Sequence, residues 1–453
     1  MDVGRVGSLF IRGPEPVLQG RDMVLTLTLK RPIDARALFA SYETLVQRNL
    51  SLRSILVADR DSFAWAALSA RGLKARLARE RTATQRSRTL DSIHTDNSAH
   101  DLLPLRYAQL DARTLAVFVD HALANGYGAL AWIDAWLRIY AGEDLAPMTD
   151  TPAPRAGWPV RTWRAVARLF WTLAYVITFV VRAGRRAAIE TVDLTRGKTP
   201  EVHTLGYAAR TFRFSQEETT RVVASSKASG ATVTEAMCVA VATALFAAQP
   251  DKRRVLLSLP VDLGAHVDGF SRYAPGNYTG SLIVQLFRDR PLDAQVRAAL
   301  LAMRRGVPFG LASLVAAFAK TERALFDRFA SQARMPIAAR APFENFSCAV
   351  SSLGVLHHAA VARHVETISA HGMTQTVFFC AMTLGGRLSF ELAVANDLFD
   401  ASETFRLGDA IRDALLQPDA ATEPTPLPLA ARSRGLRAIP ALQAEESSVG
   451  GRT

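Results

Sequence analysis

The residue best placed to do chemistry is His121, in the segment Asp120-His-Ala-Leu-Ala-Asn125-Gly126. The apolar run 115–119 before it predicts a strand, and Asn125-Gly126 predicts a tight turn that leads into an apolar helix. An imidazole has an ordinary pKa near neutrality, so a histidine held at a strand end can accept a proton and return it. A structural role is the commoner outcome for a single histidine, so the catalytic assignment depends on the rest of the chain.

The other residue types that carry chemistry are scattered. The three cysteines have neither the spacing of a metal site nor the even number of a disulfide framework, which favours a reducing compartment. None of the nine histidines falls in a metal-binding pattern, and the only adjacent pair is His357-His358. The N-terminal stretch has no apolar core or cleavage site typical of a secretory signal. The sequence therefore predicts a cytoplasmic protein with no metal and no bound cofactor.

The formal net charge of +12 indicates either a nucleic acid or an anionic membrane surface as a partner. The charge is concentrated between Arg155 and Lys198, a stretch that contains nine basic residues and only two acidic ones. Inside this stretch, residues 169–181 carry no charge, but a bilayer span needs about 20 apolar residues. No nucleic-acid recognition motif is present, and the aromatic residues cluster with aliphatic ones rather than with basic ones. We therefore expect a membrane surface and no nucleic acid.

A helical projection of this stretch separates two faces. One narrow face carries Tyr175, Thr178 and five arginines, and apolar residues occupy the remaining arc. The five are Arg164, Arg168, Arg182, Arg185 and Arg186. This pattern predicts a helix in a membrane interface, with the apolar side down and the arginines toward headgroups. The candidate membrane contacts are Trp163, Phe170, Ile177, Arg164, Arg168, Arg182 and Arg186. The alternative is a buried connecting helix with a solvated basic edge.

Strand and helix patterns alternate along the chain in two halves of similar content, which predicts an α/β protein with a pseudo-duplicated architecture. We expect a first half over 1–150, a crossover with the basic helix over 151–200, a second half over 201–416 and a flexible tail over 417–453.

Local signals mark several helix starts and one turn in this chain. Asp34 and Thr234 are expected to cap helices, and Ser215 opens a capping box with the glutamate three residues later. Gly385-Gly386 between two apolar runs predicts a two-residue hairpin turn. An amphipathic helix is expected over 311–332.

Seven segments, in the correct order, resemble motifs of the chloramphenicol-acetyltransferase-like acyltransferase superfamily, which includes condensation domains, alcohol and wax-ester acyltransferases and polyketide-associated acyltransferases. Asp120–Gly126 resembles the superfamily's H-H-x-x-x-D-G signature. The other six are Arg48–Arg53, Pro104–Arg106, Ser215–Glu235, Leu259–Leu263 with Gly276-Asn277, Val350–Gly354 and Arg387–Phe399. Each motif is unspecific by itself, but their order extends the resemblance over residues 23–416.

The resemblance implies a fold of two pseudo-duplicated chloramphenicol-acetyltransferase-like domains with α/β mixed sheets and an active site at their interface. It implies acyl transfer from a thioester donor, either acyl-CoA or an acyl-carrier protein, to a hydroxyl or amine of a lipidic or natural-product acceptor. His121 would be the general base, and Asn125 and Gly126 would shape the turn. Asn277, Ser351 and Ser352 would be the candidates for stabilising the oxyanion or positioning the substrate. With the basic helix, this predicts a protein peripheral to the inner face of the cell membrane.

Two positions depart from the signature. Asp120 stands where the first histidine is usual, and Asn125 stands where an aspartate is usual. An asparagine keeps hydrogen bonds but cannot neutralise an arginine, so the turn is expected to be weaker. These departures leave two alternatives to an active acyltransferase: a catalytically degraded relative that binds acyl chains or a partner protein, and a stand-alone peptide condensation enzyme that works with separate carrier proteins.

Overall fold

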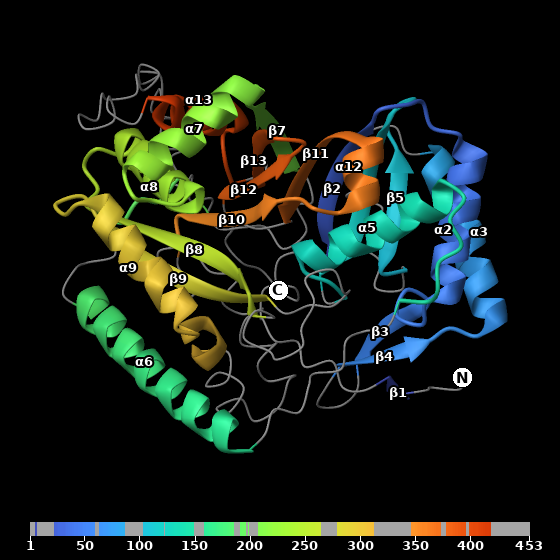
Figure 1. Cartoon of the computed structure of the whole chain (residues 1–453), viewed down its shortest axis with the longest axis horizontal. Helices are drawn as coiled ribbons and strands as arrows, with labels where there is room; N and C mark the ends of the chain where they lie inside the picture. The colour runs from blue at the N-terminus through green and yellow to red at the C-terminus, as the bar shows by residue number, and fades with distance from the viewer. Residues whose placement is uncertain are drawn as a thin grey trace, which may run out of the picture.

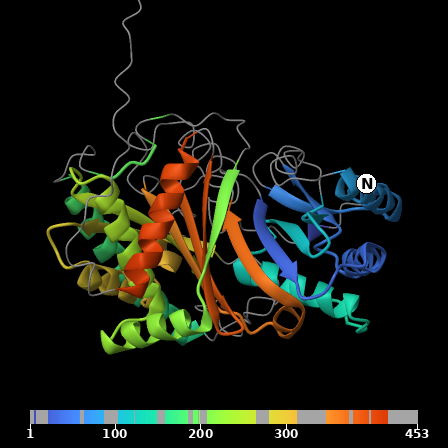
Figure 2. The ribbon, with the colours of Figure 1, turned by 90° about the horizontal axis from the view of Figure 1, so that it is seen from above.

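The computed structural model describes thirteen stretches of the amino-acid sequence, and these form three β-sheets with their helices (Figure 1). The described residues are 5–6, 22–58, 63–86, 103–121, 123–148, 158–184, 191–195, 198, 207–263, 279–311, 346–372, 377–395 and 398–417. The two larger sheets lie side by side, with most helices on their outer sides (Figure 2). This is the mixed α/β architecture that the sequence predicts.

The sheet of the first half has four antiparallel strands in the order β11-β2-β6-β5. Its strands are β2 (Asp22–Leu29), β5 (Leu105–Gln109), β6 (Thr114–Asp120) and β11 (Val365–Gly372). Three of them come from the N-terminal part of the chain, whereas β11 arrives from residue 365 onward. The helices of this half are α2 (Ala35–Arg48), α3 (Ala70–Arg86), α5 (Gly126–Tyr140) and the short α12 (Ala359–His364).

The sheet of the second half has six strands in the order β7-β13-β12-β10-β8-β9. It is mixed, because β10 runs parallel to both β12 and β8 while the other pairs are antiparallel. Its strands are β7 (Tyr207–Arg213), β8 (Arg254–Asp262), β9 (Thr279–Phe287), β10 (Cys348–Val355), β12 (Val377–Leu384) and β13 (Arg387–Ala395). Its helices are α7 (Gln216–Ala228), α8 (Val233–Ala248), α9 (Leu292–Arg304) and α13 (Ala401–Leu416).

A small third sheet, in the order β1-β4-β3, joins β1 (Arg5–Val6), β3 (Ser54–Ala58) and β4 (Phe63–Ala67). The last two strands, which are consecutive in the chain, pair with each other in antiparallel orientation.

Most of the predicted caps are present. The Asp34 side chain accepts hydrogen bonds from the first turn of α2, and Ser215 forms a capping box with Glu218. The prediction for Thr234 is wrong, because Thr232 caps α8 and Glu235 completes a capping box with it. A capping box needs an acidic side chain three residues after the cap, and only Thr232 has that spacing to Glu235.

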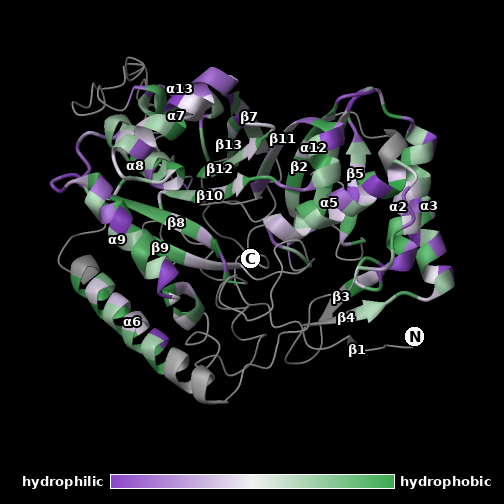
Figure 3. Ribbon diagram, viewed as in Figure 1, coloured by the Kyte–Doolittle hydropathy of each residue, from purple (hydrophilic) through white to green (hydrophobic). Residues whose placement is uncertain are grey.

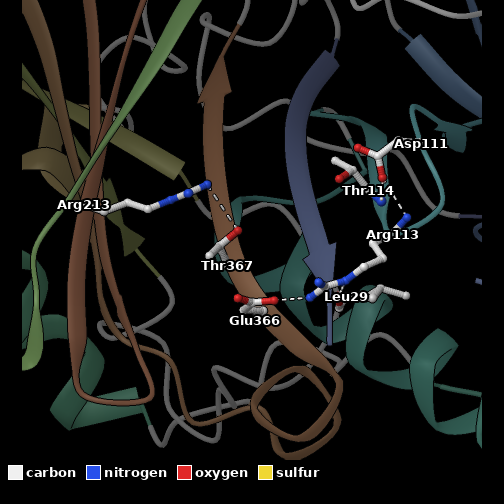
Figure 4. A network of polar contacts seen from close by, with 7 residues as sticks. All are labelled: Leu29, Asp111, Arg113, Thr114, Arg213, Glu366 and Thr367. Atoms are coloured by element: carbon white, nitrogen blue, oxygen red, sulfur yellow. Dashed lines mark hydrogen bonds and ion pairs between the residues drawn. The ribbon is translucent and has the colours of Figure 1, made fainter. Parts of the chain in front are cut away.

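Strand β11 connects the two halves of the molecule (Figure 4). On one side, Arg213 of β7 donates from Nη2 to Thr367 Oγ1 at 3.4 Å. On the other side, Arg113 forms an ion pair with Glu366 and donates from Nε to the Leu29 carbonyl at 2.8 Å. The two main hydrophobic clusters also mix residues from both large sheets. The junction between the halves is therefore a packed interface.

The helix predicted for a membrane interface is α6 (Trp158–Gly184), which lies along the outer edge of the second half beside α9 and β9 (Figure 1). Its apolar face points away from the protein, as a helix in a membrane interface requires, but Arg168 departs from the predicted arrangement. Arg168 and Tyr175 face the protein, where the guanidinium lies 4.8 Å from the Phe309 ring centre and the phenol hydroxyl donates to the Ile283 carbonyl. The apolar face is exposed, so the alternative of a buried helix with a solvated basic edge is wrong.

Some predictions fall outside the described residues. The description does not extend to Asn277, to Arg186 or to the helix expected over 311–332 beyond its first residue. It also does not include the side chains of Trp163, Arg164 and Arg182. Within the part of the chain that is described, no single helix has the length and apolar character to cross a bilayer; the bent pair α7–α8 passes on length and composition alone.

Candidate active site

His121 follows directly after β6, a strand flanked by β2 and β5 within its sheet. The turn that carries it is closed by the Asp120 carbonyl, which accepts main-chain hydrogen bonds from Leu123 at 2.9 Å and Ala124 at 3.3 Å. Asp120 is itself buried, and its N–H donates to the Pro104 carbonyl at 2.7 Å. A buried strand and a hydrogen-bonded turn thus hold the histidine at a fixed place.

Asn125 caps the helix that follows the turn. Its side-chain Oδ1 accepts a hydrogen bond from the Gly128 N–H at 2.9 Å, which satisfies one of the free donors at the start of α5. At the other end of the amide, Nδ2 donates a long hydrogen bond of 3.4 Å to Asp262 Oδ1 at the end of β8. The asparagine therefore joins the turn in the first half to a strand in the second half.

The start of α5 packs closely against β10 of the second half. A Cβ atom added at Gly126 would lie 2.6 Å from Leu353 Cδ2, so the close approach depends on a residue without a side chain. The neighbouring Tyr127 hydroxyl donates to the Leu353 carbonyl at 3.2 Å. The glycine that the sequence assigns to the turn thus sets the distance between the two halves beside His121.

A cavity of about 110 Å³ lies at this junction. The five predicted site residues that the structure describes all line it, and Asn277 falls outside the described residues. These five are His121, Asn125, Gly126, Ser351 and Ser352. Apolar residues of both halves complete much of the wall, among them Met23, Leu25, Phe346 and Phe378.

The two serines of β10 differ in their hydrogen bonds. Ser352 Oγ accepts from Thr234 Oγ1 at 3.3 Å, so the Ser352 hydroxyl still has its own hydrogen to donate. The Ser351 hydroxyl instead bonds to the Cys380 sulfur on the paired strand. Of the two, Ser352 is therefore the better hydrogen-bond donor toward the cavity.

The surroundings of His121 favour its neutral form. Burial lowers the pKa of this imidazole below its ordinary value of 6.5, and an interaction with the residue's own main chain opposes the shift less strongly. A neutral imidazole at pH 7 has a lone pair that can accept a proton. The local electrostatics thus suit a general base.

A second histidine lines the cavity, and sequence reasoning did not identify it. His371 of β11 is bonded through Nδ1 to Glu391 Oε1 of β13 at 2.5 Å, and both side chains are buried. Glu391 also accepts a hydrogen bond from Thr211 Oγ1 at 3.0 Å. No local motif marks this pair, because the two residues lie on different strands and meet only where the sheets face each other.

The Glu391 carboxyl is held in its ionised form. Burial by itself would raise its pKa, but the neighbouring His371 and hydrogen bonds from His371, Ser369 and Thr211 have a larger combined effect. The pKa of Glu391 consequently lies below its ordinary value.

The thiols near the cavity are poor nucleophiles. Burial raises the pKa of Cys380 to about 12, with a further contribution from the charge of Glu391, and burial also raises the pKa of Cys348. Reaction requires the thiolate, which is scarce in such surroundings. Among the described residues, no group of three or more His, Cys, Asp or Glu side chains is arranged to hold a metal ion.

Comparison with solved structures identifies the fold. Polyketide synthase associated protein 5 from Mycobacterium tuberculosis matches with a TM-score of 0.57 and 14% identity, over 93% of this chain and all of that chain. The first condensation domain of the CDA synthetase matches with a TM-score of 0.58 and 14% identity, over 92% and 93% of the two chains. TRI3 trichothecene 15-O-acetyltransferase from Fusarium sporotrichioides matches with a TM-score of 0.62 and 10% identity, over 91% and 95%.

No family model and no curated protein matches the sequence. The structural matches nevertheless span nearly the whole chain, and they include condensation domains and an acetyltransferase. The chain therefore has the chloramphenicol-acetyltransferase-like fold, with its two halves packed around the cavity, as the seven motifs predict.

Proposed function

We propose that this protein is an acyltransferase that moves an acyl group from a thioester to a hydroxyl or amine, with His121 as the general base. The observation that carries the proposal is the position of His121. A histidine whose neutral form is favoured lines a cavity between the two halves of a fold shared with condensation domains and an acetyltransferase. The serines of β10 line the same cavity.

The proposed reaction needs one group that accepts a proton and one group that donates a hydrogen bond to the oxyanion. His121 takes the proton from the acceptor's O–H or N–H group as that atom attacks the thioester carbonyl carbon. The Ser352 hydroxyl donates a hydrogen bond to the oxyanion of the tetrahedral intermediate. When the C–S bond breaks, His121 returns the proton to the leaving thiolate. Asn125 and Gly126 act on the geometry of the turn rather than on the substrate.

The donor and acceptor follow from the same proposal. The donor is acyl-CoA or an acylated carrier protein, which is a co-substrate and not a bound cofactor. The acceptor is lipidic or a natural product, which agrees with the apolar wall formed by Met23, Leu25 and Phe346. We place the reaction in the cytoplasm, at the inner face of the cell membrane.

The test is release of free thiol from a panel of acyl-CoAs and acyl-carrier proteins in the presence of alcohols or amines. We expect His121→Ala to lower kcat by about 10²–10⁴-fold, because general-base assistance is lost. His357→Ala is the matched control, since His357 is an exposed histidine away from the cavity, and it should leave the rate unchanged. Equal turnover of His121→Ala and the native protein would refute the assignment.

The panel also separates the two alternative functions. Turnover with amines and carrier-bound donors only would indicate a condensation enzyme, in line with the condensation domains among the structural matches. Binding of acyl-CoA without turnover of any donor would indicate a catalytically degraded relative.

A further inference from the structure

The outward face of α6 is apolar over the whole length in which its side chains are described, residues 166–181. Seven large aliphatic or aromatic side chains on this face are between 45% and 63% exposed. They are Val166, Leu169, Phe170, Leu173, Ile177, Val180 and Val181. At 100° per residue they fall on one side of the helix, and they extend over about 24 Å. Figure 3 shows the helix as a largely apolar element at the rim of the molecule.

The opposite face of α6 holds the polar groups and fixes the helix to the protein. Tyr175 bonds to β9, and Gln285 Nε2 of that strand donates to the Phe179 carbonyl at 3.3 Å. Arg168, the only charged residue between 166 and 181, lies on this inner side, packed against Gly306 and Phe309. The outward face of α6 therefore carries no charge between residues 166 and 181. The side chains of Arg168 and Tyr175 contact the protein instead.

An outward apolar face is the reverse of the usual orientation of a surface helix in aqueous solution. An amphipathic helix on a soluble domain normally turns its apolar side inward, because burial of apolar area is the main stabilising contribution. Contiguous apolar surface on the outside of a domain marks a contact with another apolar phase. The helix is too short in its apolar part to span a bilayer, but a helix that lies flat needs no such length.

The charges at both ends of this segment favour an anionic lipid surface over a protein partner. In the sequence, Arg161 and Arg164 precede it, Arg182, Arg185 and Arg186 follow it, and no acidic residue occurs between Arg155 and Arg186. The whole chain carries a formal charge of +12. Basic residues beside an apolar helix face are attracted to anionic headgroups while the apolar side chains enter the acyl boundary.

The inner side of α6 is connected to the cavity wall through apolar residues. A separate hydrophobic cluster contains Phe179 of the helix together with Phe346 and Ala349, and Tyr175 and Phe378 pack against it. Three members of this group, Phe346, Ala349 and Phe378, also line the cavity that contains His121. The same apolar packing therefore reaches from the exposed helix to the candidate active site.

We propose that the outward face of α6 is a docking surface for an anionic lipid bilayer, in which the helix lies flat with its apolar side chains in the acyl boundary. Docking there brings the apolar side of the cavity wall next to the membrane, where a lipidic acceptor or acyl donor would be found. The docking itself does not depend on the acyl-transfer reaction, whereas its use for substrate delivery rests on the proposed function.

The first test is flotation of the purified full chain with vesicles of phosphatidylcholine alone or mixed equally with phosphatidylglycerol. We expect binding to the mixed vesicles, and a loss of about tenfold or more for the double variant Phe170→Glu/Ile177→Glu, because two apolar contacts become charges. Val223→Glu on α7 and Val355→Glu on β10 are matched controls, since both residues are exposed and apolar but lie on other elements. Their binding should equal that of the native chain.

The second test measures insertion without reference to activity. All three native cysteines are buried, so an environment-sensitive fluorophore can be attached selectively to Ile177→Cys or, as a control, to Val223→Cys. The emission of the label at position 177 should shift to the blue when mixed vesicles are added, and that at position 223 should not.

Two outcomes would overturn the proposal. One is equal vesicle binding, or equal absence of binding, by the native chain and the double variant. The other is a lower Tm or a change of oligomeric state in the double variant without lipid, which would mean that another part of the chain or a second copy covers this face. A failure of thiol release in every donor test would refute the proposed reaction but leave the vesicle results unaffected.

Discussion

Asn125 is held at both ends of its side-chain amide, and this changes how its departure from the H-H-x-x-x-D-G signature is interpreted. The carbonyl oxygen caps α5, and the amide nitrogen bonds to the Asp262 carboxylate at 3.4 Å. An aspartate could keep the first contact but not the second, because a carboxylate cannot donate. Asn125 thus matches the acidic group that faces it, and the structure gives no sign of a turn that is left unsupported.

Replacement of Asn125 by aspartate should therefore weaken this protein. Asn125→Asp places two carboxylates side by side in a partly buried setting, so we expect a loss of about 1–3 kcal/mol in the free energy of unfolding at pH 7. Chemical denaturation measures the loss. The double variant Asn125→Asp/Asp262→Asn restores an amide–carboxylate pair with the roles exchanged and should recover most of the stability. An unchanged or higher stability of the single variant would contradict this account.

At the scale of elements, the site depends on how closely α5 approaches β10. Gly126→Val would bring a branched side chain against the buried Leu353 side chain, whose Cδ2 lies only 2.6 Å from the position of an added Cβ atom. We expect a loss of about 1–3 kcal/mol in stability from overpacking, and slower thiol release because the cavity beside His121 changes shape. Gly126→Val/Leu353→Ala makes room for the added methyl groups and should recover part of the rate. Full activity of the single variant would show that the spacing is not critical.

Elements with local signals could be predicted from the sequence. The turn glycines Gly385 and Gly386, both with positive φ, join β12 to β13 as expected, and the strand, histidine, turn and helix around His121 are present. Strand β11 was not predicted, because its place in the sheet is set by pairing with β2, more than 300 residues earlier in the chain. The inward position of Arg168 on α6 was not predicted for a related reason. Periodicity separates two faces of a helix, but tertiary contacts decide which one is buried.

The same limit applies to the candidate site. His121, Asn125 and Gly126 belong to one short motif, so their proximity follows from the sequence. His371 and Glu391 are separated by 19 residues and belong to different sheets, and only the packing of the two sheets brings them together. A long-range pair of this kind has no periodic or spacing signal that a single sequence can reveal.

At the scale of the whole molecule, the two halves are not independent segments of the chain. β11 follows β10 in the sequence but is paired in the sheet of the first half, and its neighbours in space across the junction are β12 and β13 of the other sheet. The His371–Glu391 pair lies at this crossing, beside the cavity. Because each sheet contributes one member of the pair and residues to the shared hydrophobic clusters, separation of the halves would break the pair and expose apolar surface to water. We therefore expect the described halves to unfold together.

This coupling leads to a prediction for stability and its pH dependence. Glu391→Ala should lower the free energy of unfolding by about 3–5 kcal/mol, the usual cost of removing one partner of a buried pair. The matched control is Asp409→Ala, which breaks the exposed pair with Arg210 and should cost less than about 1 kcal/mol.

The pKa of Glu391 is lowered in the folded state, so the stabilisation that its charge provides depends on pH. This stabilisation is complete above the unfolded pKa of about 4.5 and is lost as the pH falls through the lower folded pKa. Denaturation curves of the native chain and Glu391→Ala should accordingly differ most near pH 7 and converge in acid. A difference that stays constant down to pH 3 would mean that Glu391 stabilises the junction by packing rather than by its charge.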